Sequence, residues 1–324
     1  MQKLVTALLL LVVLISCDNK PSQKYVPESS GALNALTVVM DNNLWQDTIG
    51  ETIREKFAGP VDGLPRIEPL FDINQMPQQA FTGFMRKQRT FLEIKYADTA
   101  GIEMLKNPYA RPQAGVVIQG PTSRSIVDII RRDSAKIVSA FKNEDVQEKI
   151  RRINLSLKDD EPIQKAFGIS LKFPSAYRYA KQEDGFFWIR KDIPHGYMNI
   201  TIYEVPLERI TDTNTIGAII GMRNQISGDN ITVDEGARFA TEAAYAPYQY
   251  TTTIDGKPAY ETKGTWEVRG KFMAGPFINY AIKDEKNNRY LVLEGFIFKP
   301  SASQRDNMFE LESILKSVKF LDKK

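Results

Sequence analysis

Cysteine and histidine are almost missing from this sequence, which contains one of each among 324 residues. A chain whose one thiol is Cys17 forms no internal disulfide and has too few thiolates for an iron–sulfur cluster. A single histidine, His195, excludes the HExxH motif and any zinc site that needs several imidazoles. We therefore expect no cofactor and no metal.

The sequence also lacks an excess of one charge. Its formal net charge is +3 at pH 7, and 26% of its residues are charged. Nucleic-acid-binding domains usually carry a clustered basic excess, so we expect no nucleic-acid partner. The hydrophobic fraction of 42% provides ample material for a core. A chain of this length has room for two domains.

The N-terminus has the pattern of a secretory signal peptide. Lys3 precedes an apolar segment at residues 4–15 that is rich in Leu and Val. As a helix this segment would extend about 18 Å, which is too short for a hydrocarbon core of about 30 Å. The next residues complete Leu14-Ile15-Ser16-Cys17, which resembles the bacterial lipobox, where the signal is cut before a cysteine that carries lipid.

This resemblance implies that residues 1–16 are a signal peptide and that Cys17 is acylated, with palmitate among its chains. Several acyl chains anchor a protein durably, whereas one chain binds only marginally at about 0.8 kcal/mol per buried CH₂. Residues 17–33 are polar and are interpreted as the lipid anchor and a flexible tether. We expect an envelope lipoprotein that faces the periplasm. The alternatives are an uncleaved signal or a conventional secreted protein.

Residues 34–157 are predicted to form an N-terminal domain. An apolar run at 36–40 fits a buried strand, and a helix with an apolar residue at every fourth position from Trp45 to Phe57 follows it. A long helical pattern covers 123–155, and Lys142-Asn143 is expected to divide it. Other predicted elements are a strand within 67–73, a helix that starts at Pro77, and strands at 90–96 and 116–118.

A charged segment ends in Pro162, so a C-terminal domain is expected over 162–324. Asp255-Gly256 favours the turn of an antiparallel hairpin. The strand at 290–298 is apolar on both faces and is expected at the centre of a sheet. Residues 303–306 resemble a helix capping box. The predicted fold class is α+β, with two mixed α/β-sandwich domains, mostly antiparallel sheets and packed helices behind the lipidated tether.

Two family resemblances follow from these residues. The lipobox ending at Cys17, residues 36–45 (LTVVMDNNLW), residues 57–83 and the basic run at 86–89 resemble an uncharacterised bacterial lipoprotein family named domain of unknown function 4837. That family has no assigned activity. The order of elements over 170–320 is similar to that of PsbP-like domains, which are usually binding or assembly modules, although likeness of fold does not establish function.

The sequence contains no nucleophile elbow, no dinucleotide fingerprint and no EF-hand loop. The stretch from Gly264 to Lys271 has one residue too many between its glycines for a P-loop, and Phe272 stands where Ser or Thr would bind Mg²⁺. His195 lies between Pro194 and Gly196, which is typical of a turn residue rather than a general base. The sequence therefore favours a protein without enzymatic activity.

A basic cluster is the first candidate binding site. Arg86, Lys87 and Arg89 lie close to phenylalanines and could bind an anionic ligand or a lipid headgroup. The alternative is a solvated helix end, where cations are favoured by the helix dipole.

The second candidate site is a pair of acidic residues. Glu183 and Asp184 precede the aromatic run that contains Trp188, and paired carboxylates beside an aromatic face occur in glycosidases. Acidic residues before a strand are more often part of a solvated turn. We therefore expect a membrane-anchored binding or scaffolding module with an envelope protein or glycan as its partner. The alternative is a carboxylate-based hydrolase acting on glycan or cell-wall material.

The lipobox makes a direct prediction about Cys17. A Cys17→Ala variant should lose fatty-acid labelling and normal signal processing, because no other side chain here could form a thioether with diacylglycerol. Metabolic labelling with a fatty acid measures this, and unchanged labelling of the variant would remove the basis for the lipid anchor.

Overall fold

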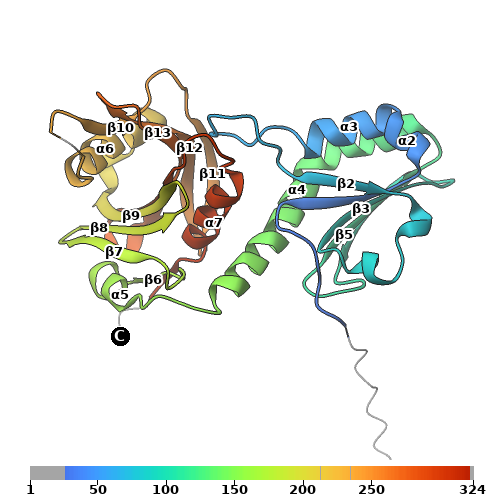
Figure 1. The fold of residues 1–324 in the computed structure, drawn as a ribbon, viewed down its shortest axis with the longest axis horizontal. Helices are drawn as coiled ribbons and strands as arrows, with labels where there is room; N and C mark the ends of the chain where they lie inside the picture. The colour runs from blue at the N-terminus through green and yellow to red at the C-terminus, as the bar shows by residue number, and fades with distance from the viewer. Residues whose placement is uncertain (1–25, 212, 234, 322–324) are drawn as a thin grey trace, which may run out of the picture.

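The computed structural model describes residues 26–211, 213–233 and 235–321. Cys17 and the predicted signal peptide lie outside these residues. Figure 1 shows two lobes, each built around its own sheet, with the long helix α4 (Ser123–Ile153) between them. Within the described residues, no helix is both long enough and apolar enough to span a bilayer.

The N-terminal domain has a five-stranded sheet in the order β2-β1-β3-β5-β4. Its pairings are parallel except for that of β4 with β5. Apolar side chains of α3 and α4 pack on one face of this sheet. The elements are β1 (Ala35–Val39), α2 (Asn42–Gln46), α3 (Thr48–Phe57), β2 (Asp72–Met76), β3 (Thr90–Tyr96), β4 (Gly101–Lys106) and β5 (Ala114–Gly120).

The strand predicted at 90–96 coincides with β3, whereas α4 differs from the prediction. The helix does not break at Lys142-Asn143, because buried Phe141 and Val146 continue its apolar contacts past that point. The helix predicted from Pro77 is replaced by two short 3₁₀ helices, at Gln78–Ala80 and Gly83–Lys87. The edge strand β4 was missed because most of its residues are partly or fully exposed and show no apolar run.

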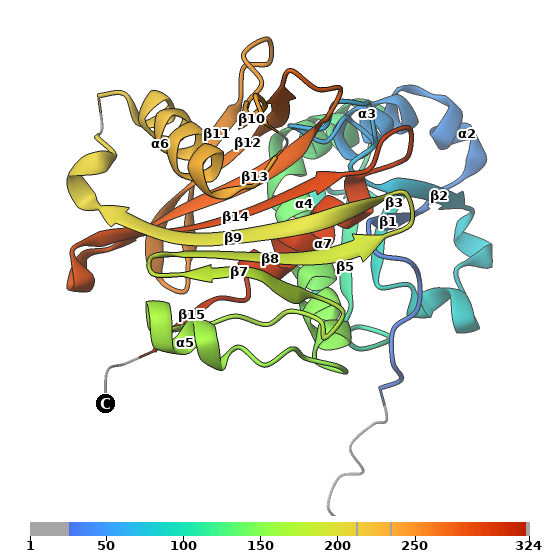
Figure 2. The same ribbon diagram turned by 60° about the vertical axis from the view of Figure 1, so that its left-hand side comes forward.

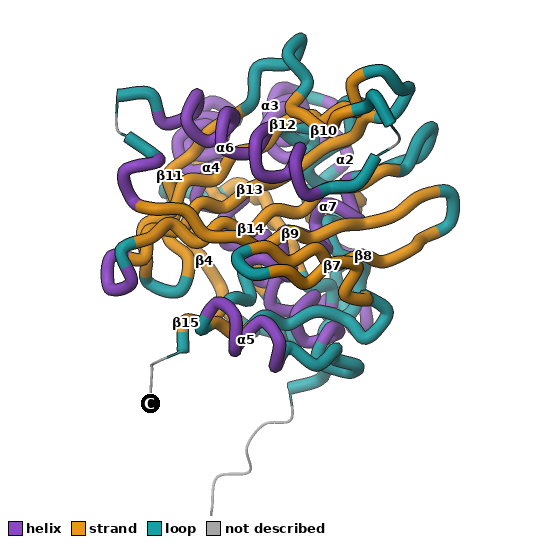
Figure 3. Tube along the Cα trace, turned by 90° about the vertical axis from the view of Figure 1, so that its left-hand side faces the viewer, coloured by secondary structure: helices purple, strands orange, loops and turns teal. Residues whose placement is uncertain are grey.

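The C-terminal domain has an eight-stranded antiparallel sheet in the order β10-β12-β13-β14-β9-β8-β7, with β11 also paired to β12. Figure 2 shows α6 in front of this sheet and α7 behind it, and Figure 3 shows its central strands side by side. The elements are α5 (Glu161–Phe167), β6 (Ile169–Ser170), β7 (Arg178–Glu183), β8 (Phe186–Ile193), β9 (Gly196–Pro206), α6 (Thr215–Asn230), β10 (Arg238–Thr241), β11 (Tyr248–Ile254), β12 (Lys257–Arg269), β13 (Ala274–Asp284), β14 (Arg289–Phe298), α7 (Arg305–Leu315) and β15 (Lys319–Phe320).

The α+β class with mostly antiparallel pairing and a two-domain layout is confirmed. The predicted central position of the strand at 290–298 is also confirmed, since β14 lies between β13 and β9. Asp255 and Gly256 both have positive φ angles, 48° and 75°, as the primed hairpin turn requires. These features follow from local sequence signals because the pattern along each strand reports which of its faces are buried.

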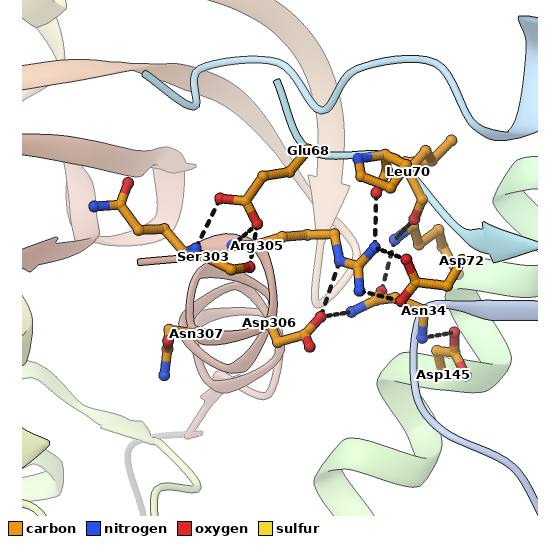
Figure 4. Close-up of polar contacts among 12 residues, drawn as sticks. Asn34, Glu68, Leu70, Asp72, Asp145, Ser303, Arg305, Asp306 and Asn307 are labelled. Atoms are coloured by element: carbon orange, nitrogen blue, oxygen red, sulfur yellow. Dashed lines mark hydrogen bonds and ion pairs between the residues drawn. The ribbon is translucent and has the colours of Figure 1, made fainter. Parts of the chain in front are cut away.

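The predicted capping box at 303–306 is wrong, because the N-terminus of α7 is capped from the other domain. The Glu68 carboxylate accepts hydrogen bonds from the Gln304 amide at 2.7 Å and the Arg305 amide at 3.0 Å, and from the Ser303 hydroxyl (Figure 4). Glu68 is 8% exposed. Its negative charge also lies at the positive end of the helix dipole.

A second set of contacts joins the same helix to the N-terminal sheet. The Arg305 guanidinium donates to both carboxylate oxygens of Asp72, at 3.0 and 2.7 Å, and to the Pro69 carbonyl at 2.9 Å. Asp306 accepts from Arg305 and from the Asn34 side-chain amide, each at 2.9 Å (Figure 4). Hydrogen bonding to Arg305 lowers the pKa of Asp72. The two domains are therefore held together by charge-assisted hydrogen bonds in a fixed geometry.

Removing the interdomain cap should weaken the whole protein. We expect Glu68→Ala to lower the free energy of unfolding by about 1–3 kcal/mol, because buried backbone donors lose their acceptor. Chemical denaturation followed by circular dichroism measures the change. The matched control is Glu55→Ala at an exposed helical position, which should change stability far less than Glu68→Ala does. Equal effects of the two substitutions would contradict the cap.

Candidate functional site at the domain junction

A pocket of about 280 Å³ lies where the two domains meet, and Arg305 is part of its wall. Domain interfaces are common positions for ligand sites. The segment from Val61 to Leu64 and helix α4 line it from the N-terminal domain, and β12, β13 and α7 line it from the C-terminal domain. We call it the interdomain pocket. Its apolar lining residues include Leu64, Leu70, Val138, Phe277, Met308 and Phe309.

Acidic and basic side chains share this pocket. The Lys263 ammonium lies 2.8 Å from a Glu261 oxygen, and Lys316 forms an ion pair with Glu312 on α7. The Tyr280 hydroxyl donates to Glu261 at 2.7 Å. Since Glu261, Lys263, Glu312 and Lys316 all line the pocket, its wall presents opposite charges at short separations.

Lys142 reaches the pocket from the middle of α4. Its ammonium donates to the Asn34 side-chain oxygen at 2.7 Å and to the Leu70 carbonyl at 3.2 Å. It also lies 4.7 Å from the centre of the Phe71 ring and 5.2 Å from that of Phe309. Burial lowers the pKa of Lys142 from 10.5 to about 8, because both hydrogen-bond acceptors are neutral and burial penalises the charged form.

Glu312 remains ionised although it is partly buried in the wall of the pocket. Burial opposes ionisation, but the positive charges of Lys263 and Lys316 outweigh it and lower the pKa of Glu312 to about 2. The same pairing raises the pKa of Lys263, since Glu312 and Glu261 oppose the effect of burial. A carboxylate with a lowered pKa is suited to hold a cation and is a poor general acid near neutral pH.

The structure separates the three residues of the predicted basic cluster, because Arg89 is buried whereas Arg86 and Lys87 are not. Arg89 is 3% exposed, donates to the carbonyls of Gly31 and Ala32 at 3.2 and 3.3 Å, and lies 3.7 Å from the Asp145 carboxylate. Arg86 is exposed and Lys87 is half-buried. The structure therefore does not bring Arg89 onto one surface with the other two.

Arg86 and Lys87 contact aromatic rings. The Arg86 guanidinium lies 5.0 Å from the centre of the Tyr109 ring and donates to the Phe81 carbonyl at 3.0 Å. The Lys87 ammonium lies 5.9 Å from the centre of the Phe84 ring.

The acidic pair lies where β7 ends, with Glu183 as the last residue of the strand and Asp184 in the turn that leads to β8. Glu183 forms a 3.0 Å ion pair with Lys181, and Asp184 is exposed. Trp188 is half-buried, and its indole donates to the Asn199 side chain at 2.9 Å. None of the three predicted hydrolase residues lines the interdomain pocket. In the described part of the chain, no group of three or more His, Cys, Asp or Glu side chains is placed to hold a metal ion.

The residues that form the interdomain pocket were missed in the sequence. Lys142 interrupts an apolar helical stripe, and a charged residue at such a position predicts a helix break. In the structure the helix continues and the lysine is largely buried instead. Glu312 and Lys316 form an ordinary i, i+4 pair on α7, a pattern that usually lies on a solvated face. Only the packing of α7 against the other domain makes these charges part of a pocket.

Comparison with family models gives the first identification. A model described as domain of unknown function (DUF4837) matches residues 156–317, which is half of the chain. This protein belongs to the DUF4837 family. The resemblance seen in the sequence is confirmed, and the DUF4837 match lies in the C-terminal domain. A second model, domain of unknown function (DUF8532), matches residues 29–154, the region that contains the segments 36–45 and 57–83.

Solved structures resemble about half of this DUF4837 protein at low identity. The cyanobacterial PsbP protein CyanoP from Synechocystis sp. PCC 6803 is 11% identical over 51% of this chain and 92% of its own, with a TM-score of 0.34. The Saccharomyces cerevisiae Ran-binding protein Mog1p is 10% identical over 48% and 91%, with a TM-score of 0.32. No curated protein matches the sequence.

The lowered pKa of Lys142 predicts a pH dependence. Between about pH 8 and pH 10.5 the unfolded chain binds a proton that the folded chain has released, so this group makes stability rise with pH. Relative to Lys142→Met, the wild-type free energy of unfolding should therefore increase across that interval. Denaturation at several pH values measures the difference. Lys136→Met, at an exposed site of α4, controls for exchanging lysine for methionine. A difference that is constant with pH would contradict the prediction.

Proposed function

We propose that this DUF4837 protein is a lipid-anchored lipoprotein of the bacterial envelope that acts as a non-enzymatic binding module. The interdomain pocket carries the proposal, because both domains supply charged groups of both signs to it. Its partner is an envelope protein or glycan that inserts a polar, charged group between apolar walls.

The charges of the pocket are positioned before a partner arrives. Glu261 is held by Lys263 and Tyr280, and Lys142 is held by Asn34 and Leu70. Charged groups that are already fixed lose little conformational entropy on binding. Interactions between charges are also stronger in a partly buried site than in water. An inserted group of either sign therefore meets a complementary side chain.

The ionisation of Glu312 supports binding over hydrolysis. A glycosidase needs a general acid whose pKa is raised, whereas the pKa of Glu312 is lowered to about 2. Glu183 and Asp184 are exposed at the end of β7, and Trp188 lines a different pocket that neither of them lines. No specific contact favours the hydrolase alternative at these residues.

The path of the chain supports attachment through the N-terminal domain. The Ser29 amide donates to the Arg111 carbonyl at 3.1 Å, and the Ser30 amide donates to the Lys87 carbonyl at 2.8 Å. Arg89 holds the carbonyls that follow. A lipid on Cys17 would therefore be connected to the body at this edge, and the expected envelope location rests on the lipobox.

Site-specific crosslinking in the native envelope tests the proposal. Ser139 is exposed on α4 and lines the pocket, so Ser139→p-benzoylphenylalanine should give a discrete adduct after irradiation. Ala135 is exposed one turn earlier on the same helix and does not line the pocket, so the same change there should give none. Lys263→Met should weaken the adduct formed at position 139. Equal adducts at 135 and 139, or none at 139, would contradict binding in the pocket.

A further inference from the structure

A second pocket, separate from the domain junction, lies on the α6 side of the C-terminal sheet. It has a volume of about 180 Å³ and is lined by Trp188, Asn199, Phe239, Trp266 and Phe296 together with rim residues. We call it the aromatic pocket. A cavity of about 150 Å³ holds one benzene ring. The aromatic pocket therefore has room for a ligand of about one six-membered ring.

Three rings form a rigid wall of this pocket. Phe239 stacks on Trp266 with 5.1 Å between the ring centres, and Trp266 meets Phe296 edge to face at 5.6 Å. The Trp266 indole donates to the Ile297 carbonyl at 3.2 Å, which fixes its orientation. Each of these three side chains is at most 2% exposed. These buried rings pack on one another and form this wall of the pocket.

Asn199 supplies the specific polar group. Its side-chain oxygen accepts from the Trp188 indole at 2.9 Å, and because an indole nitrogen only donates, this contact fixes which end of the amide is oxygen. The opposite end, Nδ2, is buried and has no hydrogen-bond partner, and the residue is 0% exposed. A buried donor without an acceptor is unfavourable. Asn199 is therefore ready to donate to a ligand oxygen.

The charged side chains that line the pocket are both basic. Arg190 and Lys271 line it, and no acidic side chain does so among the described residues. Arg190 lies directly across from Asn199 in the pairing of β8 with β9. Its guanidinium is stacked 3.8 Å from the centre of the Tyr197 ring and contacts Asp192 at 3.2 Å. An acceptor bound to Asn199 would therefore lie near a cation that is held in place.

We propose that the aromatic pocket binds a ring-sized organic anion. Its carboxylate accepts from Asn199 Nδ2 beside Arg190, and its ring lies against Trp188 and Trp266. An aromatic acid and a sugar acid share this chemistry. The site is independent of the interdomain pocket, so the two proposals can fail separately.

Tryptophan fluorescence tests this site directly, because two of the three tryptophans in the chain line the pocket. The full-length protein carrying Trp45→Phe removes the signal of the other domain. Titration with benzoate and with glucuronate separates the aromatic acid from the sugar acid, and benzyl alcohol and glucose are the uncharged controls. We expect a saturable change with at least one acid and a much weaker change with its uncharged control. No saturable change with either acid would overturn the proposal.

Two variants tie the binding to the pocket. Asn199→Asp keeps an acceptor for the Trp188 indole but places a negative charge where the donor was, and should weaken acid binding by about tenfold or more. Lys271→Glu changes an exposed rim residue and should weaken binding without affecting folding. Thr201→Val, at an equally buried position of β9 outside the pocket, should bind as the wild type does. Wild-type affinity in the Asn199 and Lys271 variants would overturn the proposal.

Discussion

The first turn of α7 has its free backbone amides turned toward the N-terminal domain, where the Glu68 carboxylate accepts from two of them. Arg305, in the same turn, donates to both carboxylate oxygens of Asp72. Buried amides at a helix end need acceptors, and here these acceptors belong to another domain. Docking therefore buries these amides and supplies their acceptor in the same contact.

That docking also creates the interdomain pocket. It places Lys142 of α4 opposite Phe309 and Glu312 of α7. A lysine whose pKa is lowered to about 8 and a glutamate whose pKa is lowered to about 2 then share one wall. Lys142 has its hydrogen bonds to Asn34 and Leu70 within its own domain, and Glu312 has its ion pair with Lys316 within the other domain. Docking brings these two sets of charged groups to one pocket.

The aromatic pocket lies on a face of the C-terminal sheet that also buries charged groups. The α6 side of this sheet contains a buried ion pair in which Arg223 contacts Glu294 at 2.9 Å, and both side chains are 0% exposed. Asn279 also donates to Glu294, at 3.0 Å. Burying charge is costly unless it is paired and hydrogen-bonded. This face of the sheet thus combines polar groups with aromatic rings, whereas the α7 face is an apolar core.

The sequence by itself determined the elements whose buried and exposed faces can be recognised from neighbouring residues. The strand at 90–96, the hairpin turn at Asp255-Gly256, the central position of β14 and the family resemblance all follow from periodicity or short motifs. It also determined the expectation of a lipid on Cys17, which depends on four consecutive residues. The strand, the hairpin turn, the central position of β14 and the family resemblance are confirmed, because each depends on a signal that lies within a few residues. The lipid on Cys17 stays a prediction, since Cys17 lies outside the described residues.

Only the tertiary structure decided the features that depend on contacts between residues far apart in the sequence. Glu68 caps a helix that lies 236 positions further along the chain, and no local pattern links the two. The continuity of α4 through Lys142 depends on packing and not on the helical period. The burial of Arg89, and the placing of Trp188 in a pocket that excludes Glu183, depend on how strands and domains meet. A sequence pattern reports the environment of one face, whereas a binding site is made where two such faces come together.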